Sequence, residues 1–194
     1  MKVADTTRAG EELRGGGVAL VPTDTVVGLV AGESGLARLA EIKNRDPAKP
    51  VAALCASATE AFSLAADVPP LARELARRFW PGPLTLVLDA PDPRNGGTIG
   101  VRVPDHAVVR ELLAAYGGPL YATSANLAGQ PAPGTLAEVS SEVSRSVDLV
   151  VEGAAGGGEA SAVVDLSGGG KARLLRRTPW LSEETLSRMA REQE

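Results

Sequence analysis

The chain has 194 residues, of which 44% are hydrophobic and 3% aromatic, so its core must be built mainly from Ala, Val and Leu. This length suits one large domain that can bury a core without disulfides or metals. Acidic residues outnumber basic ones by 24 to 20, for a formal net charge of −4. That balance argues against a constitutive, tight nucleic-acid binder, which usually carries a basic excess. The net charge does not exclude a local basic groove, because basic residues gather at 73–78 and 171–177.

Cys55 is the one cysteine, so the chain cannot form an internal disulfide. This usage is typical of the reducing cytoplasm. The apolar neighbours of Cys55 predict a buried, inert thiol rather than a nucleophile. The N-terminus lacks the apolar stretch of a signal peptide, and no run approaches the ~18 apolar residues of a membrane span. We therefore expect a cytoplasmic protein that does not enter a membrane.

In chain order, apolar spacing and turn residues predict interleaved helices and short strands. Helices are expected at 6–13, 35–43, 59–65, 70–79, 105–116 and 136–143 and after residue 182, and strands at 18–21, 25–31, 51–55, 84–88, 99–103, 119–122, 147–151, 162–166 and 173–175. Asp105 and Ser182 are the predicted N-caps of two of these helices. Because some consecutive strands have no helix between them, we expect an α/β fold with a mixed parallel and antiparallel sheet flanked by helices. No linker divides the sequence, which predicts a single domain over 1–194, with its core at about 10–178 and a helical tail at 181–194.

Two short clusters carry groups suited to binding anions. Lys43 and Arg45 stand at the end of a helical stretch, where an arginine fork and a lysine point charge can converge. Ser124 and Asn126 follow a short strand and offer a hydroxyl and an amide. By themselves, Lys43 and Arg45 fit an ordinary solvated helix end better than a binding site, and Ser124 and Asn126 also fit a plain turn.

Seven motifs together carry a closer resemblance. They are Val21–Leu29 (VPTDTVVGL), Lys43–Arg45 with Lys49–Pro50, Phe79–Thr85 (FWPGPLT), Thr98–Pro104 (TIGVRVP), Thr123–Asn126 (TSAN), Ser161–Asp165 (SAVVD) and Leu174–Arg176 (LLR). In order and spacing they resemble the YrdC family over roughly residues 16–177. The resemblance implies a twisted mixed sheet with a concave nucleotide-binding face. It also implies a threonylcarbamoyl-AMP synthase, which joins L-threonine, bicarbonate and ATP and releases pyrophosphate.

The resemblance also implies the site residues. ATP contacts are expected at Lys43, Arg45, Lys49, Thr98, Ser124, Asn126 and Arg176, with Lys43 and Arg45 as the catalytic pair, and threonine contacts at Thr25, Arg102 and Ser161. No residue is assigned to a metal, and Mg²⁺ is expected to arrive with the phosphates of ATP. Arg177 follows Arg176 directly and leaves the register of that contact open. The product would pass to threonylcarbamoyl-transferase proteins that modify tRNA, with weak tRNA contact by this chain left open.

Three positions depart from the family pattern. The sequence therefore predicts nucleotide binding more firmly than it predicts the identity of the amino-acid substrate. Val27 stands in place of a tyrosine, Leu54 in place of a threonine-contacting histidine of longer members, and Ala162 in place of a threonine. Two alternatives therefore remain: an RNA- or ribosome-binding module, and a carbamoyl-adenylate-forming enzyme with another acceptor. The glycine-rich segment 153–158, just before Ser161, is predicted to be either a simple turn or a hinge.

Overall fold

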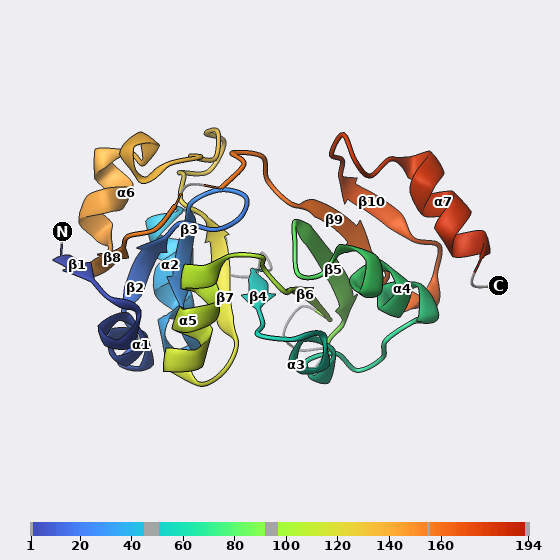
Figure 1. Ribbon diagram of the computed structural model, residues 1–194, viewed down its shortest axis with the longest axis horizontal. Coiled ribbons are helices and arrows are strands. Elements are labelled where there is room, and N and C mark those ends of the chain that lie inside the picture. The colour runs from blue at the N-terminus through green and yellow to red at the C-terminus, as the bar shows by residue number, and fades with distance from the viewer. Residues whose placement is uncertain (1, 45–50, 92–96, 155, 193–194) are drawn as a thin grey trace.

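The computed structural model describes residues 2–44, 51–91, 97–154 and 156–192, and these form one twisted, mixed sheet flanked by helices (Figure 1). The ten strands described are β1 Lys2–Ala4, β2 Val18–Val21, β3 Gly28–Ala31, β4 Ala52–Leu54, β5 Leu84–Asp89, β6 Thr98–Arg102, β7 Leu120–Ser124, β8 Leu149–Val151, β9 Ala162–Asp165 and β10 Arg173–Arg176. Their order across the sheet is β1-β8-β2-β3-β7-β4-β6-β5-β9-β10. Parallel pairs, such as β4 with β6, occur beside antiparallel pairs, such as β5 with β6. The predicted α/β fold with a mixed sheet is confirmed.

The helices divide between the two ends of this sheet. They are α1 Thr6–Arg14, α2 Leu36–Ile42, α3 Ala58–Ser63, α4 Pro70–Phe79, α5 Ala107–Tyr116, α6 Ser141–Ser146 and α7 Glu183–Arg191. In Figure 1, α1, α2, α5 and α6 surround the end that contains β1, β8, β2 and β3, whereas α3, α4 and α7 lie beside β5, β9 and β10. The N- and C-termini lie at opposite ends of the long axis. No helix in the described part of the chain is long and apolar enough to cross a membrane.

Local sequence signals predict most element ends, and the structure corrects three of these predictions. Ser182 caps α7 as predicted, because its hydroxyl accepts from the Thr185 N–H. Asp105 does not cap α5: His106 occupies the cap position, and the Asp105 carboxylate instead pairs with Arg110 at 3.0 Å. The strand expected at 25–31 begins at residue 28, because residues 23–25 form a hydrogen-bonded loop. The helix expected at 136–143 is a short 3₁₀ turn at 136–138 followed by α6 at 141–146.

The half of the sheet around β2 is buried on both faces. Side chains alternate along a strand, so neighbours point to opposite faces. In β2, Ala19 and Val21 pack in the cluster that includes residues of α1 and α5, whereas Val18 and Leu20 pack in the cluster that includes residues of α2 and α6. This explains why β2 reads as an unbroken apolar run.

The half of the sheet around β5 is covered on one face only. Leu84, Leu86 and Leu88 point into the core beneath α3, α4 and α7. Thr85 and Val87 alternate with these leucines and therefore point to the opposite face, where they line a pocket. The same alternation places Gly100 of β6 on the pocket side. The fold thus leaves one sheet face open to a ligand.

Candidate active site

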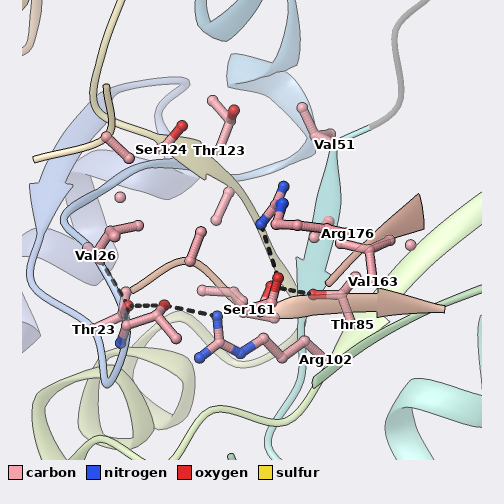
Figure 2. A pocket seen from close by; sticks show the side chains of 18 of the residues that line it. Thr23, Val26, Val51, Thr85, Arg102, Thr123, Ser124, Ser161, Val163 and Arg176 are labelled. Carbon is pink, nitrogen blue, oxygen red and sulfur yellow. Dashed lines mark hydrogen bonds between the residues drawn. The ribbon is translucent and has the colours of Figure 1, made fainter. Parts of the chain in front are cut away.

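The pocket lies on this open sheet face and has a volume of about 480 Å³. Its walls come from β3, β4, β5, β6, β7, β9 and β10 and from the loop at 23–26, so segments far apart in sequence meet there. Figure 2 shows Arg102, Thr85, Ser161 and Arg176 along one side and Ser124 along another. Apolar side chains form part of the wall between these polar groups, among them Leu54 and Val163.

Arg102 is a buried cation at the end of β6, with 6% of the residue exposed. Its Nη2 donates to Asp24 Oδ1 at 2.6 Å, its Nη1 to Thr25 Oγ1 at 2.9 Å and its Nε to the Gly82 carbonyl at 3.1 Å. Burial lowers the Arg102 pKa, and the charge of Asp24 opposes that shift. The pairing is therefore a buried ion pair between the end of β6 and the loop at 23–26. One N–H on each terminal nitrogen is left over by these three bonds, which involve described residues only.

The loop at 23–25 is held in place by the glycine-rich segment. The Gly157 and Gly158 N–H groups donate to the carbonyls of Asp24 and Thr25 at 3.2 and 2.8 Å. A Cβ added to Gly156 would lie 2.2 Å from the Thr23 carbonyl oxygen, so only glycine allows this approach. The segment is therefore packed against the site. Whether it also moves as a hinge stays a prediction.

Arg176 is a second cation in the same pocket. Its Nη1 donates to the Ser161 carbonyl at 3.0 Å (Figure 2). Burial lowers the Arg176 pKa, and the nearby positive charge of Arg102 lowers it further. The strand register shifts between Leu174 and Arg176, so that Leu175 and Arg176 both line the pocket. Arg177 instead contacts Glu183 at 3.4 Å, so Arg176 is the one of these two arginines that lines the pocket.

Lys43 contacts the turn at 124–126, two residues of which line the pocket. It is buried, with 5% exposure, although the sequence permits a solvated helix end. Its ammonium donates to the carbonyls of Ser124 and Asn126 at 2.6 and 2.9 Å and lies 3.2 Å from Asn126 Oδ1. Ser124 and Asn126 themselves line the pocket. Lys43 of the first cluster therefore meets the second cluster, and it holds the turn that lines the pocket.

The remaining predicted site residues differ in whether they line the pocket. Thr98 lies at the far end of β6, opposite Asp89, and is not among the described residues that line the pocket. Strand alternation still places it on the same sheet face as Arg102. The predicted ATP contacts Arg45 and Lys49 lie outside the described residues. Thr25 and Ser161 line the pocket as expected.

Three contributors were not predicted as site residues from the sequence. Thr85 lines the pocket, and its alternation with buried leucines is a signal that could have identified it. Asp24 is also a common residue type in turns, and no local pattern reveals its ion pair with Arg102. Gly156 belongs to a run of glycines in which no member stands out.

Cys55 is buried, as predicted, and burial raises the pKa of its thiol to about 12.

Comparison with known proteins agrees with this fold. A family model for Sua5, YciO and YrdC proteins, described as "Telomere recombination", matches residues 11–178. Threonylcarbamoyl-AMP synthase of Pyrococcus abyssi is 36% identical over 80% of this chain and 48% of its own length. The mouse enzyme of that name is 35% identical over 85% of this chain and 64% of its own, and that of Chromohalobacter salexigens is 35% identical over 87% and 94%. This chain therefore spans about half to two thirds of the first two relatives.

Solved structures show the same similarity. A variant of P. abyssi Sua5 superposes with a TM-score of 0.84 at 34% identity, covering 94% of this chain and 59% of that one. P. abyssi Sua5 in complex with L-threonine gives a TM-score of 0.77 at 32% identity, covering 85% and 53%. Escherichia coli YciO, at 24% identity and a TM-score of 0.79, shares the fold. The site lies on the open sheet face of an α/β protein. The chain is a member of the Sua5/YciO/YrdC family.

Proposed function

We propose that this chain is a threonylcarbamoyl-AMP synthase, a nucleotidyltransferase that forms L-threonylcarbamoyl-AMP and pyrophosphate from L-threonine, bicarbonate and ATP. The observation that carries the proposal is the pair of guanidinium groups, Arg102 and Arg176, in one pocket. Arg102 is matched by Asp24, whereas the described partner of Arg176 is a backbone carbonyl. Two neighbouring cations in one pocket, Arg102 buried and Arg176 more exposed, favour an anionic ligand. The names of the relatives, and the L-threonine bound to one of them, support threonine and ATP as the ligands proposed for this pocket.

The proposed chemistry needs positioning and charge stabilisation more than a covalent nucleophile. The threonine amine first combines with bicarbonate, giving a carbamate and water. A carbamate oxygen then attacks the α-phosphorus of ATP, and pyrophosphate leaves with the electrons of the broken P–O bond. Both reactants are anions, so cations and fixed donors must bring them together.

The pocket offers a place for each reactant. We assign the amino-acid carboxylate to Arg102, whose two leftover N–H groups can bind it, with Thr25 and Ser161 beside it. We assign ATP to the side that carries Ser124 and Asn126, with Lys43 behind this turn and Arg176 at the boundary between the reactants. Arg45, Lys49 and Thr98 stay proposed ATP contacts.

Mg²⁺ would enter with the phosphates of ATP, neutralising their charge and orienting pyrophosphate as the leaving group. In residues 2–44, 51–91, 97–154 and 156–192, no three His, Cys, Asp or Glu side chains cluster in a way that could hold a metal ion. The Asn126 amide oxygen, beside the pocket, is a hard oxygen donor that fits an ion carried by phosphate. It also accepts from Lys43, which fixes its direction.

The experiment is to incubate the purified chain with ATP, Mg²⁺, bicarbonate and L-threonine and to measure pyrophosphate. We expect release to require all three substrates together. Release without bicarbonate would remove the carbamate step, and release with another amino acid but not threonine would favour the enzyme with a different acceptor. No release, together with binding of RNA, would favour the RNA-binding alternative. The product would pass to threonylcarbamoyl-transferase proteins, which mass spectrometry of the adenylate and a coupled tRNA assay would test.

A further inference from the structure

Two pairs of hydroxyl groups lie beside Arg102 in the pocket. Thr23 and Thr25 form one pair, with 3.0 Å between their Oγ1 atoms. Thr85 and Ser161 form the other, with 2.9 Å between Thr85 Oγ1 and Ser161 Oγ (Figure 2). All four residues are buried and line the pocket. The two pairs differ in how their protons are used.

The protons of the first pair are both committed. Thr23 Oγ1 donates to the Val26 carbonyl at 2.8 Å, so its single proton is used there. Thr25 must then be the donor in its contact with Thr23. Thr25 Oγ1 also accepts from Arg102 Nη1. The hydrogen bonds therefore run in one direction from Arg102 through Thr25 and Thr23 to Val26, and no proton remains for a ligand.

The second pair keeps one proton. Two hydroxyls carry two protons, and their mutual hydrogen bond uses one. Neither Thr85 Oγ1 nor Ser161 Oγ makes another hydrogen bond to a described residue. The pair therefore offers the pocket one O–H donor and unused acceptor lone pairs. Its position is fixed by the sheet, because β5 and β9 are parallel neighbours with Leu84 opposite Ala162.

We propose that Thr85 is a further specificity-determining residue, which fixes Ser161 so that the hydroxyl pair binds the side-chain hydroxyl of the amino-acid substrate. The inference rests on the proposed function. Charged acceptors such as the substrate carboxylate are matched by Arg102 and Arg176, which have donors only. A neutral hydroxyl both donates and accepts, and the Thr85–Ser161 pair has both capacities to spare. A site built to bind a hydroxyl rejects analogues without it, because its buried polar groups then lack a partner.

The test compares L-threonine with L-2-aminobutyrate, which has the same carbon skeleton without the hydroxyl. We expect the wild-type kcat/KM to favour threonine by roughly 100-fold or more. Thr85→Val keeps the shape but removes the hydroxyl, and should reduce this preference about tenfold or more. Its kcat/KM for 2-aminobutyrate, which makes no bond to the pair, should fall much less than its kcat/KM for threonine, so the effect appears in the ratio of the two values. Thr85→Ser retains the hydroxyl and should restore the wild-type preference.

The Ser161→Ala variant and the double variant complete the cycle. If the two hydroxyls act as a unit, the double variant should lose little more preference than either single variant. An unchanged preference in Thr85→Val, or a wild type that does not distinguish the two amino acids, would overturn the inference. If Thr85→Val does not fold, Thr85→Ala provides the same comparison. Calorimetric binding of both amino acids gives the same ratio without turnover, so an inactive wild type would count against the proposed reaction while the binding preference still decides the role of Thr85.

Discussion

Arg102 and Asp24, which are 78 positions apart, form a buried ion pair with 2.6 Å between Nη2 and Oδ1. Only 7% of the Arg102 side chain and 12% of the Asp24 side chain are exposed. Asp24 Oδ2 is buried and accepts no hydrogen bond from any described residue. The carboxylate therefore contributes mainly its charge, which offsets that of a cation kept out of water.

Asp24→Asn should lower the free energy of unfolding by about 3–5 kcal/mol, because it leaves the Arg102 charge buried without a counter-ion. The matched control is Asp105→Asn, which breaks an ion pair with Arg110 whose side chains are 66% and 51% exposed. That exposed pair should contribute less than about 1 kcal/mol. Urea unfolding followed by circular dichroism measures both, and equal losses in the two variants would contradict the buried-pair account.

Arg176→Ala should weaken use of the nucleotide, whereas Arg177→Ala should not. Arg176 lines the pocket, whereas 75% of the Arg177 side chain is exposed beside Glu183. Loss of a charge-assisted hydrogen bond to phosphate is worth roughly 1.5–3 kcal/mol, which corresponds to about 10- to 100-fold in kcat/KM for ATP. Pyrophosphate release at varied ATP measures the effect. Similar behaviour of the two variants would remove Arg176 from the nucleotide site.

Gly156→Ala should impair use of the amino acid, whereas Gly157→Ala should be tolerated. A Cβ on Gly156 would lie 2.2 Å from the Thr23 oxygen and 2.7 Å from the Thr25 nitrogen, so this loop must move. Among the described residues, a Cβ on Gly157 would meet only the Asp24 oxygen within 4 Å, at 3.9 Å. Because a displacement of about 1 Å at a site can cost roughly 100-fold, we expect the KM for threonine to rise by roughly 10- to 100-fold in the first variant. Steady-state kinetics decide, and a rise confined to the KM for ATP would show that the loop does not serve the amino acid.

Cys55 should be unreactive in the folded protein. Burial raises its thiol pKa to about 12, so at pH 8 it is the neutral thiol rather than the reactive thiolate. Labelling by iodoacetamide should be at least roughly 100-fold slower in the native protein than in urea, where the pKa returns to about 8.5. Between pH 8 and 10 the native rate should still rise by about tenfold per pH unit, without levelling off, because the pKa lies above this range. Mass spectrometry follows the label, and rapid native labelling at pH 8 would show that Cys55 is accessible.

The sequence by itself determined most of the elements and much of the site's composition. Alternation in Leu84–Leu88 fixes which side chains enter the core, and Ser182 marks the start of α7 through its hydroxyl. These signals are local, since they depend on neighbours within a few positions. The same is true of the Lys43 and Ser124–Asn126 clusters, whose residue types suit anions in any setting.

Only the tertiary structure decided which of these residues meet. Lys43 reaches Ser124 across 81 positions, and Thr85 reaches Ser161 across 76. Each contact depends on strand order, such as β5 lying between β6 and β9, and alternation specifies a face of the sheet without specifying the neighbouring strand. The same reason explains why Asp24 could not be identified from its loop. Its partner Arg102 arrives on β6, and the pairing stabilises a charge that becomes buried only when the sheet is assembled.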